Sequence, residues 1–95
     1  MTIWKFPLET TDRQTIRMPK DACILSVQTQ RGDPQLWAMV NSTAPMVGRR
    51  IRIYGTGHEM GEDLIPYMGS AFVGTYQLSG GALVFHVFDA GEIDA

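Results

Sequence analysis

The sequence contains a single cysteine, Cys23, among its 95 residues. One cysteine cannot form an intramolecular disulfide, and it cannot supply a zinc site built from several cysteine ligands. Its neighbours Ala22, Ile24 and Leu25 are all apolar. This surrounding predicts a buried, unreactive thiol rather than a nucleophile.

Long apolar runs and an excess of positive charge are also missing. No stretch reaches the roughly 20 apolar residues that a membrane-spanning helix requires. The segment Met1–Phe6 has neither the hydrophobic region nor the cleavage site of a signal peptide, so we expect a cytoplasmic protein. The formal net charge is -2 at pH 7, which gives no electrostatic basis for sequence-independent binding to nucleic acid.

Catalytic motifs are absent as well. No serine occupies a Gly-x-Ser-x-Gly elbow, and the glycines of Gly55–Asp63 lack the Gly-Lys-Ser/Thr ending of a phosphate-binding loop. His58, Glu59, Glu62 and Asp63 have side chains that can bind a divalent cation, but such residues in a solvated loop mainly serve solubility. We therefore predict a non-enzymatic protein with no cofactor and no metal site.

What the sequence does contain is a hydrophobic pattern with a period of two, which is typical of β-strands. The expected strands are Ile3–Leu8, Gln14–Met18, Ala22–Gln30, Leu36–Val40, Arg49–Tyr54 and the two halves of Phe72–Phe88. The pattern predicts an all-β fold, a small antiparallel sandwich or partly open barrel of about six to seven short strands with little or no helix. We expect one domain over residues 1–90 and a flexible acidic tail over residues 91–95.

The segment Ala82–Phe88 departs from this alternation because it is apolar on both faces. An antiparallel sheet with one wet face normally alternates. The segment is therefore expected either to be the central strand of the sandwich or to form a seam between subunits of a homodimer or larger assembly. The expected interface residues are Leu83, Phe85, His86 and Phe88. For His86 a hydrogen-bonded structural or interface role is favoured over contact with a ligand.

Arg50 and Arg52 share one face of a predicted strand, with Tyr54 beside them. Residues two apart on a strand are roughly 7 Å apart, and guanidinium groups at that spacing bind phosphates or acidic protein surfaces. The alternative is a solvated strand face whose charges prevent edge aggregation. Arg13, Arg17 and Lys20 would extend the basic stripe if their strand lies alongside. The predicted ligand or partner contacts are Arg50, Arg52, Tyr54, Gly55, Gly57 and His58.

Three segments taken together, Ile3–Leu8, Ile51–His58 and Tyr76–Phe88, resemble a family of small proteins encoded by bacteriophages and prophages, whose function is unknown. The resemblance runs over most of the chain. It implies a phage accessory protein in the cytoplasm of an infected bacterium, and it brings no catalytic residues.

The leading hypothesis is a protein that binds a host protein and inhibits a bacterial defence system or another host process. Exposed aromatic residues such as Trp4, Phe85 and Phe88 fit such a contact surface. Two alternatives stay open. One is a sponge that sequesters a small nucleotide immune signal in a pocket between subunits, and the other is a structural component of the virion.

Overall fold

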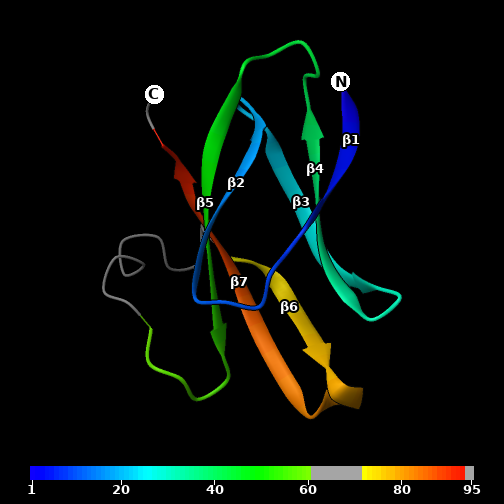
Figure 1. Ribbon diagram of the computed structural model, residues 1–95, viewed down its shortest axis with the longest axis vertical. Helices are drawn as coiled ribbons and strands as arrows, with labels where there is room; N and C mark the ends of the chain where they lie inside the picture. The colour runs from blue at the N-terminus through cyan, green and yellow to red at the C-terminus, as the bar shows by residue number, and fades with distance from the viewer. Residues whose placement is uncertain (61–71, 94–95) are drawn as a thin grey trace.

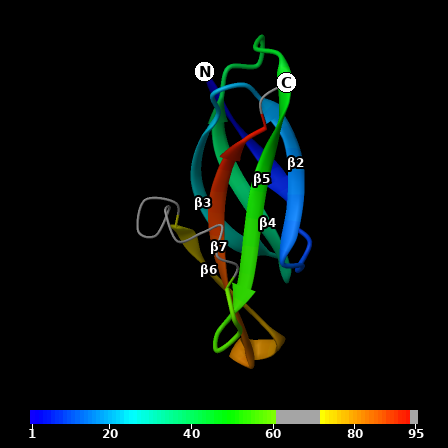
Figure 2. The ribbon, with the colours of Figure 1, turned by 90° about the vertical axis from the view of Figure 1, so that its left-hand side faces the viewer.

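The computed structural model describes residues 1–60 and 72–93, which form seven strands in two antiparallel sheets (Figure 1). The three-stranded sheet has the order β1 (Thr2–Pro7), β4 (Asp33–Val40) and β3 (Cys23–Gln30). The four-stranded sheet has the order β2 (Arg13–Pro19), β5 (Met46–Gly55), β7 (Leu83–Glu92) and β6 (Phe72–Leu78). Figure 2 shows β5 and β7 in front of β4, as two layers. The predicted sandwich is confirmed, and its sheets are not closed into a barrel.

The hydrophobic core lies between the two sheets. Its fully buried side chains include Met18 on β2, Leu36 on β4, Ile51 and Ile53 on β5, and Val87 on β7, each at most 1% exposed. Each such side chain contributes about 1.5–3 kcal/mol relative to an exposed position. The inward orientation of Met18, Ile51 and Ile53 is the one that the period-two pattern predicts.

β7 is an interior strand, because it pairs with β5 on one side and with β6 on the other. Val87 points into the main core, while Phe88 on the opposite face packs against a small second cluster formed by Tyr54 and Ala90. Of the two explanations for its apolar pattern, the central strand is confirmed. The predicted hairpin is also present, and Gly80 and Gly81 in its turn adopt the positive φ values of 67° and 97° that favour glycine.

The alternation of β3 reverses at Leu25, where its register with β4 shifts. One extra residue in a strand moves all following side chains to the opposite face. Ala22 therefore faces the core before the bulge and Val27 faces it afterwards, whereas Cys23 and Leu25 are exposed. The prediction that Cys23 is buried is wrong for this reason.

Because the Cys23 thiol is exposed, we expect it to react in the folded protein. An aromatic disulfide reagent should label one thiol per chain, at a rate within about tenfold of that of the urea-unfolded chain. Cys23→Ser should abolish labelling without changing the melting temperature. Labelling that begins only after denaturant is added would show that the thiol is covered.

The β3 and β6 strands are edge strands of different sheets, and they lie side by side (Figure 1). They approach so closely that a Cβ added to Gly74 on β6 would lie 2.9 Å from Cγ1 of Val27 on β3. Glycine within a strand commonly marks such a close approach of another backbone. Gly74 thus allows the two sheets to meet along this side.

Arg49 lies on the inner face of β5 at one end of the sandwich. Its Nε and Nη2 donate to the two carboxylate oxygens of Asp89 on β7 at 2.9 and 2.7 Å, and its Nη1 donates to the carbonyl oxygen of Ala22 at 3.0 Å. The Glu92 carboxylate lies 3.6 Å from Nη1 and also accepts from the Asp21 amide at 2.5 Å. This network connects β5 and β7 to the turn between β2 and β3.

Strand pairing reaches into the first residues of the predicted tail. Gly91 and Glu92 belong to β7, and the Ile93 amide donates to the Gly48 carbonyl at 2.8 Å. The sequence predicts a long connection over Gly55–Gly69, in which Pro66 and Gly69 limit any helix to one turn over Glu62–Met68. Residues 61–71, which include that turn and most of that connection, lie outside the described residues, as do residues 94–95.

Candidate anion-binding face

The outer face of the four-stranded sheet collects arginines from two strands that are distant in sequence. Three residues of β2 lie directly opposite three residues of β5: Arg13 opposite Arg52, Thr15 opposite Arg50, and Arg17 opposite Gly48. Directly opposed residues of an antiparallel pair lie on the same face of the sheet. We call the surface formed by Arg13, Arg17, Arg50 and Arg52 the arginine face. The expectation that Arg13 and Arg17 extend the basic stripe is thus fulfilled.

The arginine face holds four of the eight lysine and arginine residues of the chain. Among the described residues of these strands no aspartate or glutamate points to this side, because Asp89 and Glu92 turn inward to Arg49. The charged side chains that the described strand residues place on this face are therefore all positive, although the net charge of the chain is -2.

Arg50 lies at the centre of this face and leaves one polar atom unsatisfied. Its Nε is buried and has no hydrogen-bond partner. Its Nη2 lies 3.7 Å from the position that a Cβ of Gly91 would occupy, so the guanidinium group passes over a residue without a side chain. Buried polar groups are nearly always hydrogen-bonded. An oxygen of a carboxylate or phosphate is the acceptor that a guanidinium group binds best.

The two remaining predicted contacts on β5 are less accessible than the sequence suggested. Arg52 is 9% exposed and Tyr54 is 5% exposed, so neither points freely into solvent. Tyr54 packs edge-on against Phe88, and Phe88 packs edge-on against Phe72, with ring centroids 6.4 and 5.6 Å apart. Among the aromatic residues of this face, Phe72 is the exposed one, at 48%.

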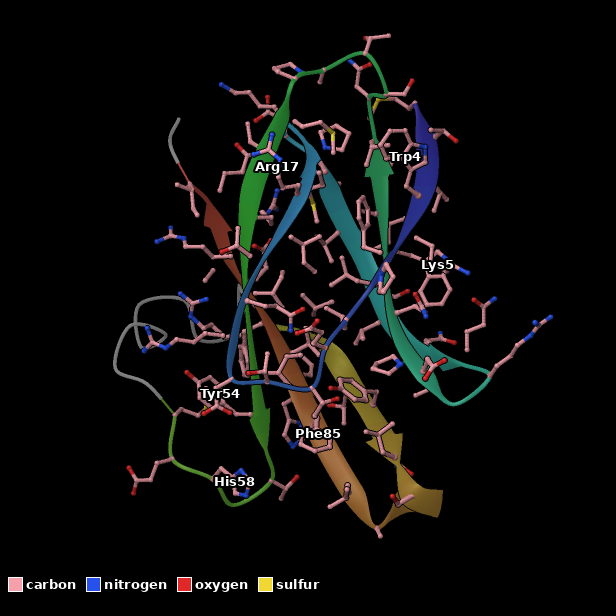
Figure 3. All side chains as sticks on the ribbon, viewed as in Figure 1. Trp4, Lys5, Arg17, Tyr54, His58 and Phe85 are labelled. Carbon is pink, nitrogen blue, oxygen red and sulfur yellow. The ribbon has the colours of Figure 1, made fainter. Side chains whose placement is uncertain are left out.

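A groove of about 240 Å³ adjoins the arginine face at one end of β5. It is lined by Thr15, Arg17, Met46, Val47, Gly48 and Ile93. The side chains of Thr15 and Ile93 lie over Gly48, since a Cβ there would lie 2.9 Å from Cγ2 of Thr15 and 3.3 Å from Cδ1 of Ile93. Figure 3 shows Arg17 near this end of β5 and Tyr54 near the other. Sequence reasoning missed the groove, because it depends on the pairing of Ile93 with Gly48 beyond the predicted end of the domain.

The other predicted contacts lie at the last residue of β5, Gly55, and in the turn that follows it, Gly57 and His58. The His58 amide donates to the Gly55 carbonyl at 3.0 Å, and Gly57 has a φ of 85°. The His58 ring lies over Gly55 and lines the same pocket as Phe85. The predicted contacts therefore lie partly on the outer face of β5 and partly in this turn, and Figure 3 shows His58 beyond Tyr54 at the end of β5.

The four residues of the predicted oligomer interface do not form one surface. Phe85 stacks on Tyr76 beside the core with ring centroids 5.5 Å apart, whereas Phe88 lies on the outer face of the sheet and Leu83 is 49% exposed. The two ring nitrogens of His86 are hydrogen-bonded to the hydroxyls of Thr56 and Thr75 at 2.7 and 3.0 Å. This agrees with the hydrogen-bonded role favoured for His86, and assembly into oligomers stays a prediction.

Within residues 1–60 and 72–93 no group of three or more histidine, cysteine, aspartate or glutamate side chains could hold a metal ion. His58 and Glu59 belong to this part of the chain, whereas Glu62 and Asp63 lie outside it. The same part contains no helix with the length and apolar character needed to cross a bilayer.

Comparison with known proteins gives one match. The chain matches DUF7352, a domain of unknown function, over residues 1–94. No curated protein and no solved structure matches it.

Proposed function

The chain belongs to the DUF7352 family, and we propose that it is a non-enzymatic binding module that docks its arginine face on an acidic surface of a partner protein. One observation carries this proposal. Four arginines from β2 and β5 share one sheet face, on which Arg13 and Arg17 are exposed. Such a face attracts acidic surfaces and raises the rate of association with them.

The spacing of the arginines favours a protein over a small anion. Arg13 and Arg17 are four residues apart on β2, which corresponds to about 13 Å along a strand. Arg50 adds a further cation on the neighbouring strand, about 4.8 Å away. A surface of this size can contact several carboxylates at once.

The nucleotide alternative is less well supported. A nucleotide site on this face would use Tyr54 to stack on the base, but Tyr54 is 5% exposed and packs against Phe88. We expect cyclic nucleotides and ADP-ribose-type nucleotides to leave the melting temperature of the purified protein unchanged. A concentration-dependent increase with any of them would favour the sponge.

The resemblance to phage and prophage proteins supports a proposed cellular location and a proposed kind of partner. The partner we propose is a host protein, bound in the cytoplasm of an infected bacterium, whose defensive or other activity is inhibited on binding. A role in the virion remains the second alternative, and detection of the protein in purified particles by mass spectrometry would favour it.

The proposal is tested by affinity capture from a bacterial host lysate with charge-reversed variants. Arg13→Glu with Arg17→Glu changes two exposed residues of the face. The matched control is Lys5→Glu with Arg31→Glu, which changes two exposed cations on β1 and in the turn after β3. We expect a stoichiometric protein to be retained by the wild type and the control, to fall at least about tenfold with the face variant, and to elute with salt. Equal retention by both variants, or no retained protein, would refute the proposal.

A further inference from the structure

The groove beside the arginine face suggests which kind of segment the partner presents. We propose that it binds one aliphatic side chain of the partner, while Arg17 and Arg50 bind carboxylates next to it. The recognised segment is then a short acidic stretch with an aliphatic residue at its centre. This inference rests on the proposed function and makes it more specific.

The shape and lining of the groove fit an aliphatic side chain. Its volume of about 240 Å³ exceeds the roughly 30 Å³ of a water molecule several times over. Its lining includes Met46 and Ile93, which are 43% and 44% exposed. Apolar surface left open in a hollow and bordered by arginine is typical of an interaction hot spot.

The charges around the groove select a carboxylate. The exposed Arg17 side chain donates from Nη2 to the Met46 carbonyl at 3.1 Å, which leaves most of the five donors of its guanidinium group for a ligand. Arg50 lies opposite Thr15, a residue that lines the groove, and its buried Nε has no partner. Arg17 therefore lines the groove and Arg50 lies next to it on the same sheet face, and an acidic segment with an aliphatic residue complements both features.

The inference is tested with ¹⁵N-labelled protein and three capped eight-residue peptides. The first peptide is composed of glutamates around one central leucine. The second carries serine in place of the leucine, and the third carries glutamine in place of each glutamate. We expect the first to bind about tenfold more tightly than either of the others. Its amide shifts should be concentrated at Thr15, Gly48 and Ile93. Inorganic phosphate alone should shift Arg17 and Arg50 without shifting Ile93.

Two variants examine the two halves of the site. Ile93→Ala shortens a groove wall and should remove most of the preference for leucine over serine. Arg50→Gln should weaken the leucine peptide about fivefold, and Arg17→Gln is the exposed substitute if Arg50→Gln does not fold. The controls Leu25→Ala, at an equally exposed aliphatic residue on the other sheet, and Arg31→Gln should bind like the wild type.

The outcomes separate the two proposals. Equal binding of the leucine and serine peptides, no binding of the leucine peptide, or wild-type binding by both glutamine variants overturns the groove assignment. The arginine face still stands if capture of the host partner depends on Arg13 and Arg17. Tight, groove-centred peptide binding together with partner capture that ignores those two arginines supports the groove and overturns the proposed function.

Discussion

Arg49→Met is expected to lower the free energy of unfolding by about 3 kcal/mol at pH 7, because it leaves partly buried charges without their partner. Arg49 makes two hydrogen bonds to Asp89 and one to the Ala22 carbonyl, and the Arg49 and Asp89 side chains are only 13% and 21% exposed. The methionine keeps the length of the side chain but supplies no donor. Urea denaturation measures the change. Lys5→Met, which removes an exposed cation hydrogen-bonded to Gln30, should cost under about 1 kcal/mol.

The loss should also depend on pH. Burial raises the pKa of the Asp89 carboxyl, but hydrogen bonds from Arg49 and from the Gly91 amide outweigh burial and leave its pKa below the ordinary value. A carboxyl with a lowered pKa contributes stability above its unfolded pKa of about 3.9, and this contribution is lost as the pH falls through the folded pKa. The difference between wild type and Arg49→Met should therefore shrink below about pH 4. A difference that stays constant from neutral to strongly acidic pH would contradict the assigned role of the ion pair.

Gly74→Ala is expected to lower the free energy of unfolding by about 2 kcal/mol, since the added methyl group would overlap Val27. The distance from the new Cβ to Cγ1 of Val27 would be 2.9 Å, and Val27 is 5% exposed and has little room to move. Gln77→Ala, at an exposed position of the same strand, should change stability by less than about 0.5 kcal/mol. Chemical denaturation of both variants provides the comparison.

A double-mutant cycle identifies the cause of this effect. Val27→Ala alone should cost stability because it leaves a cavity, but it also makes room for a methyl group at residue 74. The double variant, Gly74→Ala with Val27→Ala, should then lose less free energy of unfolding than the two single variants lose in sum. The difference should be at least about 1 kcal/mol. Additive losses would mean that Gly74 is required for another reason.

Sequence periodicity predicted the strands well because burial of one strand face makes apolar and polar residues alternate along the sequence. Ile51 and Ile53 alternate with Arg50 and Arg52, and this alternation orients β5 correctly. The prediction for Cys23 was wrong because this alternation is interrupted in β3. The bulge at Leu25 leaves a run of apolar residues that fits either face, and only the register with β4 decides between them.

The site was predictable only in part, because its parts come from distant segments. Arg50 and Arg52 could be placed together from their spacing on one strand. Their proximity to Arg13 and Arg17 depends on the pairing of β2 with β5, which skips the intervening strands β3 and β4. No local signal marks such a pairing, and none marks the return of Ile93 to Gly48.

The interior position of β7 has a consequence for synthesis on the ribosome. Strands β2 and β5 can pair as soon as they emerge, but β6 joins their sheet only through β7, the last strand along the described chain. Until β7 has emerged, β5 in the nascent chain lacks the strand that pairs beside it, and its apolar inner face is less covered. Because most of its contacts join residues far apart in sequence, such a chain folds slowly and exposes apolar surface for longer than a protein built from local contacts.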